Sequence, residues 1–142
     1  MARVSFPGGA ADEWGEHLGL EMLEVTPTHV RARLLAEAKH HQPYGILHGG
    51  VYCSVVESVA SYGAGYAAAA NGARGVVGVS NHTDFLRSHS EGELLCEGEP
   101  VHVGRRQQVW DVRIRRTSDA KLVARGQVRF QVLDELPRER GQ

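Results

Sequence analysis

One stretch of this chain constrains its fold more than any other. The twenty residues from Val51 to Ala70 contain a single charged side chain, Glu57. At 100° per residue on a helix, the large apolar side chains fall on one half of the surface. Small and polar residues share a stripe about 100° wide, and these are Ser54, Glu57, Ser58, Ser61 and Gly65. A surface helix would carry lysines and glutamates along its outer face, so the pattern predicts a long, nearly buried helix.

The rest of the chain must cover this helix. Residues 20–25 and 29–35 read as two strands around a Thr-Pro-Thr turn, and from residue 75 to 132 apolar residues recur with a period of two. Gly98 and Pro100 indicate a bulge in one of these strands. Asp12 and Gly19 bracket a short helix as N-cap and stop. One helix with five or six antiparallel strands is an α+β layout.

Length and composition limit the function classes. A chain of 142 residues is one domain, and we expect residues 1–11 and 137–142 to be flexible. The net charge of −1 argues against nucleic acid or a membrane surface as the main partner. The chain shows neither a signal-peptide pattern nor a membrane-spanning stretch. Cys53 and Cys96 read as small buried residues of a reducing, cytoplasmic compartment.

Glu57 has two interpretations. A lone glutamate on an amphipathic helix is usually solvated, because glutamate is rarely buried without a partner. Here the neighbours are valines, serines and glycine, so we expect the carboxylate to be partly desolvated and its pKa to be raised. Carboxylates in such surroundings are candidates for functional sites. We therefore place the functional interpretation first.

The Gly49-Gly50 pair also fits two roles. It can be a backbone corner that needs small residues, or a place where a ligand approaches free N–H groups at a helix start. Those N–H groups stabilise negative charge, including the oxygen of a polarised carbonyl. Gln42 and His48 flank this position and can add donors or hold the loop. His40, His41 and His48 also suggest a metal site, but no carboxylate or cysteine stands beside them at ligand spacing, so no metal is expected.

The spacing of these residues has a geometric consequence. Gly49 and Glu57 are eight positions apart, which is about 12 Å along a helix axis. A glutamate side chain covers less than half of that distance. If the two groups act on one substrate, they come from different subunits. Two antiparallel helices side by side would form two equivalent sites across a two-fold axis.

Together these residues resemble the active-site stretch of the hotdog-fold acyl-CoA thioesterases. The resemblance rests on Gln42, His48-Gly49-Gly50, Glu57 and Ser61, with Phe85-Leu86-Arg87 and Gly104-Arg105-Arg106 further on. It is strongest to the phenylacetate-pathway type, which groups with the 4-hydroxybenzoyl-CoA thioesterases that use a helix glutamate. It covers roughly residues 19–132. It implies a helix wrapped by an antiparallel sheet, dimers that pair their sheets, and usually tetramers.

The resemblance also implies a mechanism that needs no cofactor. The thioester carbonyl binds the N–H of Gly49 with Gln42 nearby, and Glu57 of the other subunit acts as general base or as nucleophile. Ser61 holds the water or the carboxylate. Coenzyme A contacts are expected at two basic loops and at Gly50, and the strand near Asn81 and His82 lines the pantetheine or acyl tunnel. The loop residues are Arg87, Gly104, Arg105 and Arg106.

Two alternatives remain at this point. The first is a dehydratase of 3-hydroxyacyl thioesters on the same fold, for which His48 would face the carboxylate across the dimer. The second is a protein that binds acyl-CoA without turnover. The combination of Gln42 and Ser61 favours hydrolysis over the dehydratase. Glu57 in a groove of small residues, without an attached DNA-binding segment, disfavours the binding protein.

Overall fold

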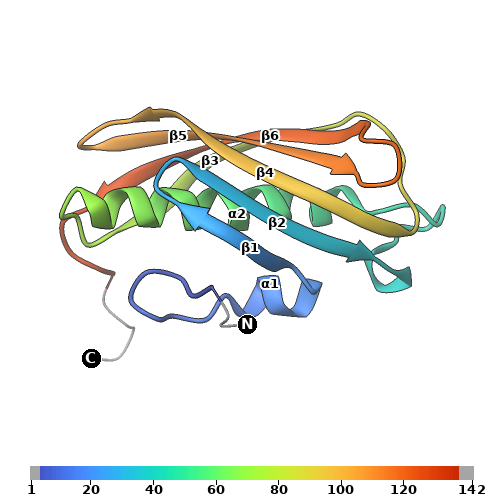
Figure 1. The fold of residues 1–142 in the computed structure, drawn as a ribbon, viewed down its shortest axis with the longest axis horizontal. Helices are drawn as coiled ribbons and strands as arrows, with labels where there is room; N and C mark the ends of the chain where they lie inside the picture. Colours follow the sequence, from blue (N-terminus) through green and yellow to red (C-terminus); the bar gives the residue numbers. More distant parts are fainter. Residues whose placement is uncertain (1–3, 138–142) are drawn as a thin grey trace.

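One long helix lies under a single antiparallel sheet in the computed structural model, which describes residues 4–137 (Figure 1). The six strands run in the order β1-β2-β4-β5-β6-β3 and curve around the helix. This confirms the α+β fold class and the hotdog layout. The elements are α1 (Glu13–Leu18), β1 (Glu21–Thr26), β2 (His29–Ala36), a 3-10 turn (Ala38–His40), α2 (Gly49–Ala70), β3 (Gly75–Phe85), β4 (Gly92–Val103), β5 (Gln107–Arg116) and β6 (Leu122–Leu133).

The buried face of α2 is the one that its helical pattern predicts. Val55, Val56 and Val59 are at most 1% exposed and pack under the sheet. Trp110 and Phe130, fully buried on β5 and β6, belong to the same core cluster. A Cβ at position 63 would overlap the Trp110 ring, so the helix approaches the sheet this closely only because residue 63 is glycine. Helix and sheet therefore fix each other's position through this contact.

Local signals in the sequence give the expected turns. Asp12 caps α1 by accepting a hydrogen bond from the Gly15 N–H at 3.1 Å, and Gly19 ends that helix in the left-handed conformation. The pairing of β4 with β5 shifts register between Pro100 and His102, which confirms the bulge. Within residues 4–137, no helix has the length and hydropathy needed to cross a membrane.

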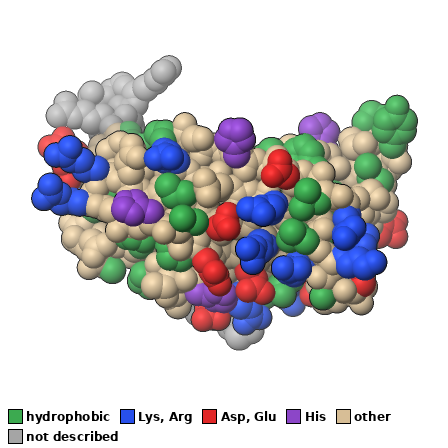
Figure 2. Space-filling model, turned by 90° about the horizontal axis from the view of Figure 1, so that it is seen from above, with side chains coloured by type: hydrophobic (Ala, Val, Ile, Leu, Met, Phe, Trp, Pro, Cys, Tyr) green, Lys and Arg blue, Asp and Glu red, His purple; other side chains and the backbone are tan. Residues whose placement is uncertain are grey.

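The outer face of the sheet carries charges of both signs. Figure 2 shows acidic and basic side chains interspersed over it, without a field of one sign. Along β4 and β5 these include Glu97, Glu99, Asp111, Arg113 and Arg115. The inward side chains of the same strands are buried, so the sheet has the one dry and one wet face that the alternation indicates.

The N-terminal segment packs against the main helix. Residues 4–11, which we expected to be flexible, lie against α2: the Phe6 ring packs edge-on against Tyr62 with centroids 5.2 Å apart, and Tyr66 donates a hydrogen bond to the Ser5 carbonyl. Residues 1–3 and 138–142 of the expected flexible ends lie outside the described residues.

The two cysteines differ in burial. Cys53 is only partly buried, contrary to expectation, because it stands on the uncovered stripe of α2. Cys96 is fully buried, as expected.

Tyr52 carries an unusual hydroxyl. The residue is 3% exposed and its ring tilts against Phe85, but its hydroxyl has no hydrogen-bond partner among the described residues. Burial raises its pKa to about 12. A buried hydroxyl without a partner has lost its bonds to water and gained nothing in return.

We therefore expect Tyr52→Phe to leave the free energy of unfolding unchanged or to raise it by about 1 kcal/mol. Urea unfolding followed by circular dichroism measures this. Tyr62→Phe, at another buried tyrosine of α2 (7% exposed), is the comparison. A loss of stability in Tyr52→Phe would mean that the hydroxyl has a partner in the assembled protein.

Candidate active site

The start of α2 leaves one backbone donor free. His48 caps the helix: its Nδ1 accepts the N–H of Gly50 at 2.8 Å, and its carbonyl accepts the N–H of Val51. Within residues 4–137, no hydrogen bond uses the N–H of Gly49. The free donor at this helix start is therefore on Gly49 and not on Gly50. Gly50 was selected as a substrate-binding residue, but its N–H is already bonded to His48.

The three neighbouring histidines have structural contacts. His40 is buried, with Nε2 2.7 Å from the Leu18 carbonyl and Nδ1 accepting the N–H of Glu37. A carbonyl only accepts, so His40 carries its proton on Nε2. The Nε2 of His41 lies 2.7 Å from the Ser90 carbonyl. His48 acts as the helix cap, which is the structural role that a histidine at a helix start usually has.

A cavity of about 270 Å³ lies at this end of α2, and we call it the Gly49 cavity. Gln42, Gly49 and Arg87 line it, so the structure brings together three residues that the sequence analysis selected. Phe85 forms another wall; its ring occupies the space where a Cβ of residue 49 would be. The remaining lining residues are Ile46, Leu47, Tyr52, Leu86 and Ser88.

Glu57 lies two turns further along α2 and faces the β3 edge of the sheet. Its Oε2 accepts a hydrogen bond from Asn81 Nδ2 at 3.2 Å, and Asn81 also donates to the Cys53 carbonyl. Its Oε1 lies 2.5 Å from where a Cβ of residue 78 would stand, so Gly78 makes room for the carboxylate. Partial burial raises the pKa of Glu57, and the Asn81 hydrogen bond opposes that shift. This confirms the expected desolvation.

Two of these contacts were not foreseen. Asn81 was selected as a substrate-binding residue, but in the structure its amide holds the carboxylate. Gly78 was not selected at all. An isolated glycine inside a run of valines often marks a close approach in a strand, and that signal was present in the sequence. His82, the next selected residue, is exposed on β3.

A second cavity, of about 380 Å³, contains Glu57 and Ser61 in its wall, and we call it the Glu57 cavity. The stripe of small residues on α2 forms its floor, and the N-terminal segment with α1 forms its opposite side. The full lining is Phe6, Ala10, Ala11, Asp12, Trp14, Glu57, Ser58, Ser61 and Tyr62. Among residues 4–137, it shares no lining residue with the Gly49 cavity. In one chain, the free N–H and the carboxylate therefore face different spaces.

The two basic loops are also far apart in one chain. Arg87 lies before β4 and Gly104, Arg105 and Arg106 follow it, so they stand at opposite ends of a strand of 12 residues. Such a strand spans more than about 30 Å. Gly104 and Arg105 line a separate cavity of about 230 Å³ beside Asn71, at the end of α2. A single ligand cannot contact both loops of the same chain at once.

One edge of the molecule is left uncovered beside the carboxylate. Within the described part of the chain, β3 is the last strand in the sheet order and pairs only with β6. It is 11 residues long, and its Val77 and Val79 side chains are 43% and 58% exposed. Three partly buried residues of α2 lie against it: Gly49 beside Phe85, Cys53 beside Asn81, and Glu57 beside Gly78 and Asn81. A long, weakly charged edge strand beside a stripe of small residues is a surface that another chain can cover.

Known proteins resemble this chain in sequence and in fold. Residues 44–123 match the family model of the thioesterase superfamily. The Mycobacterium tuberculosis protein Rv1847 is 48% identical over 121 residues, covering 84% of this chain and 86% of that protein. Its solved structure matches with a TM-score of 0.83 and 45% identity, over 88% of this chain and 99% of that chain. The 1,4-dihydroxy-2-naphthoyl-CoA hydrolase of Escherichia coli K12 is 35% identical over 99 residues, covering 70% of this chain and 66% of that protein.

Proposed function

Since the chain belongs to the thioesterase superfamily and is a thioester hydrolase, we propose that its substrates are acyl-CoA thioesters and that two subunits share each active site. The coenzyme A part of the proposal draws support from the relative in Escherichia coli that is named as a hydrolase of an aryl-CoA. It also draws support from the arginine beside the Gly49 cavity, because the planar guanidinium suits phosphate.

One observation supports an active site that two subunits share. The Gly49 N–H and the Glu57 carboxylate face cavities without a common residue. An antiparallel pair of α2 helices, joined along the two β3 edges, would set Gly49 of one subunit near Glu57 of the other. The same pairing would bury the exposed valines of β3 and complete its hydrogen bonding. A homodimer is thus the smallest active unit, and a tetramer would be a pair of such dimers.

The proposed reaction adds water to the thioester carbonyl. The carbonyl oxygen accepts the free N–H of Gly49, with Gln42 beside it, and this donor stabilises the negative charge that develops on the oxygen. As a base, Glu57 of the other subunit removes a proton from water while the hydroxide adds to carbon. The tetrahedral intermediate then expels the thiolate, which takes the proton from Glu57. Ser61, one turn further along α2, lies beside the carboxylate to hold the water.

Direct attack by Glu57 is the other route open to the same residues. The carboxylate would form an anhydride with the acyl group and release the thiolate, and water would then cleave the anhydride. Both routes give a free acid and a free thiol. The partial desolvation of Glu57 serves both, because it raises the basicity and the nucleophilicity of the carboxylate.

Coenzyme A would span both subunits under this proposal. Its pantetheine arm leaves the shared site through the Gly49 cavity toward Arg87. Gly104, Arg105 and Arg106 of the same chain are too distant to assist, so any contact from them would come from another subunit. Asn81 acts by holding Glu57, and His82 lies on the β3 surface that the second subunit covers.

Thiol release from a panel of acyl-CoAs tests the proposed function. We expect hydrolysis of at least one aryl or aliphatic acyl-CoA, followed with a thiol reagent. Tight binding of acyl-CoA without thiol release would instead indicate a binding protein. Formation of an unsaturated product from a 3-hydroxyacyl-CoA would indicate the dehydratase, although its candidate histidine already caps α2.

Asn81→Leu tests the hydrogen bond to the carboxylate. A hydrogen bond to a charged group contributes about 1.5 kcal/mol or more, so we expect kcat/KM to fall roughly tenfold. Because this bond lowers the pKa of Glu57, its loss should also move the acid limb of the pH–rate profile to higher pH. Asn71→Leu, an exposed amide at the far end of α2, is the matched control. An unchanged acid limb in Asn81→Leu would contradict the assigned role.

A further inference from the structure

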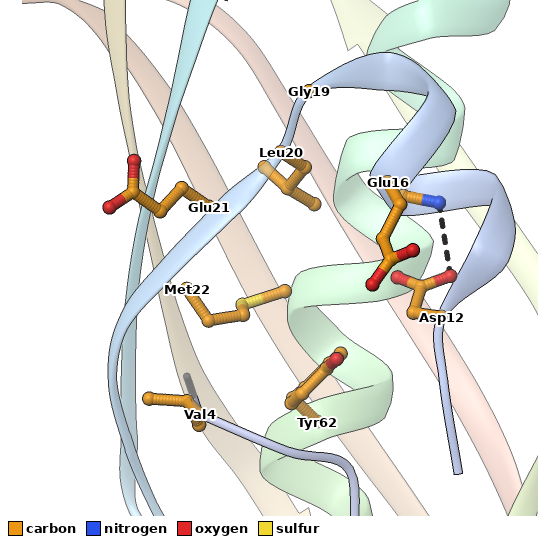
Figure 3. A pocket seen from close by; sticks show the side chains of 9 residues that line it. Val4, Asp12, Glu16, Gly19, Leu20, Glu21, Met22 and Tyr62 are labelled. Atoms are coloured by element: carbon orange, nitrogen blue, oxygen red, sulfur yellow. Dashed lines mark hydrogen bonds between the residues drawn. The ribbon is translucent and has the colours of Figure 1, made fainter. Parts of the chain in front are cut away.

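The N-terminal segment builds a wall opposite the catalytic carboxylate. Phe6, Ala10 and Ala11 come from residues that precede α1, and Trp14 comes from the first turn of α1. Together they enclose the Glu57 cavity from the side away from β3. Figure 3 shows Val4 and Asp12 of this segment on either side of Tyr62. Asp12 and Tyr62 line both the cavity drawn there and the Glu57 cavity.

The two cavities differ in their chemistry. The one drawn in Figure 3, of about 320 Å³, has Asp12, Glu16 and Glu21 in its wall and does not touch Glu57. The Glu57 cavity has three aromatic side chains and two alanines, and its polar groups lie along the α2 floor and at Asp12. Transfer of an apolar group from water into such a lining is favourable. Asp12 and Glu57 line it, and none of the other lining residues within 4–137 is a lysine or arginine, so an acyl group that carries a carboxylate would be repelled.

The size of the cavity also limits its occupant. A cavity of roughly 150 Å³ holds one benzene ring. The Glu57 cavity, at about 380 Å³, has room for more than a single ring. The aromatic side chains Phe6 and Tyr62 already meet edge-on, with centroids 5.2 Å apart. A flat ring system placed between them and Trp14 would make further contacts of the kind that aromatic pairs prefer.

We infer that residues 6–14 form the wall of the acyl pocket, and that Phe6, Ala11 and Trp14 set the size of the acyl group that the enzyme accepts. This inference rests on the proposed function, because it takes Glu57 as the group beside the thioester carbon. The acyl group then lies in the cavity of the subunit that supplies Glu57. The thiol part leaves through the Gly49 cavity of the other subunit. The preferred acyl group is bulky, apolar and uncharged.

Variants of the wall test the inference on acetyl-CoA and 2-naphthoyl-CoA. Ala11→Phe fills the cavity from an exposed position, and we expect kcat/KM for 2-naphthoyl-CoA to fall at least about tenfold while that for acetyl-CoA changes less than about twofold. Phe6→Ala and Trp14→Ala remove contacts to a large acyl group, so they should lower kcat/KM for 2-naphthoyl-CoA and not that for acetyl-CoA. Leu35→Ala is the matched control, because Leu35 is 59% exposed, as Trp14 is, and lies on β2. Equal changes for both substrates in the wall variants would overturn the inference.

A binding measurement keeps this test separate from the proposed function. Trp14 is 59% exposed and Trp110 is fully buried, so an added quencher in the cavity acts mainly on Trp14. S-(4-nitrobenzyl)-coenzyme A, a thioether that cannot be hydrolysed, should quench wild-type fluorescence. It should quench Trp14→Phe much less, and S-methyl-coenzyme A should quench neither. Strong quenching that persists in Trp14→Phe would place the ring elsewhere and overturn the inference, whether or not the wild type hydrolyses acyl-CoAs.

Discussion

Replacing Glu57 with alanine should lower kcat by about 10²- to 10⁴-fold, which is the usual contribution of a general acid–base group. The variant loses the one carboxylate of α2, and with it the group that removes the proton from water or attacks the carbonyl. The folded dimer should remain, because Glu57 is a partly buried side chain at the edge of the core rather than within it. Thiol release measures the rate, and light scattering verifies the assembly.

Glu57→Gln tests whether the charge of the carboxylate is what matters, since glutamine keeps the shape and the Asn81 contact but is not a base. We expect nearly the same loss of kcat as in Glu57→Ala. Glu99→Gln, on the outer face of the sheet, is the control and should retain activity. Wild-type kcat/KM should rise with pH through the raised pKa of Glu57, and this acid limb should vanish from the residual rate of Glu57→Gln. Full activity in Glu57→Gln would remove this residue from the mechanism.

The same carboxylate has a predictable effect on stability. Partial burial raises its pKa in the fold above the ordinary value of a glutamate, so the stability that it contributes is present at low pH and is lost as the pH rises through the raised pKa. At neutral pH the ionised Glu57 therefore lowers the free energy of unfolding, and Glu57→Gln should be at least as stable as the wild type. A variant that loses activity while it keeps or gains stability is typical of a functional site.

The sequence was most informative where one local pattern decides the structure. The helical period of α2 predicts its buried valines and its partly desolvated glutamate, because both depend only on the rotation per residue. The positions of the basic loops also followed from a local feature. A long strand between Arg87 and Gly104 already places them at opposite ends of that strand, but the resemblance to the family led us to expect coenzyme A contacts at both loops.

Other features depend on contacts between distant parts of the chain. Phe6 lies against Tyr62 across a separation of more than fifty residues, and nothing in the composition of residues 4–11 indicates that packing. The hydrogen bond between Asn81 and Glu57 requires the register of β3 against α2, which follows from the closing of the whole sheet. Periodicity assigns faces to elements, but it does not say which residues of two elements meet.

The second large effect concerns the donor at the start of α2. Gly49→Pro should lower kcat by about 10²- to 10³-fold, which is the usual cost of removing one oxyanion donor. Proline suits this position, since Gly49 is the first residue of the helix and His48 before it has φ −64° and ψ 136°. The substitution therefore removes the N–H while the helix start is kept. Gly49→Ala is the control, because its Cβ meets the same Phe85 ring but its N–H remains.

Mixing two inactive variants then tests whether the site is shared. If Gly49 of one subunit works with Glu57 of the other, a dimer of one Gly49→Pro and one Glu57→Ala chain has one complete site and one doubly damaged site. Random exchange makes half of the dimers mixed, so activity should return to about one quarter of the wild-type value. If each chain built its site alone, both sites of the mixed dimer would lack one catalytic group. A mixture that stays inactive, although mass spectrometry detects mixed dimers, would therefore contradict the shared site.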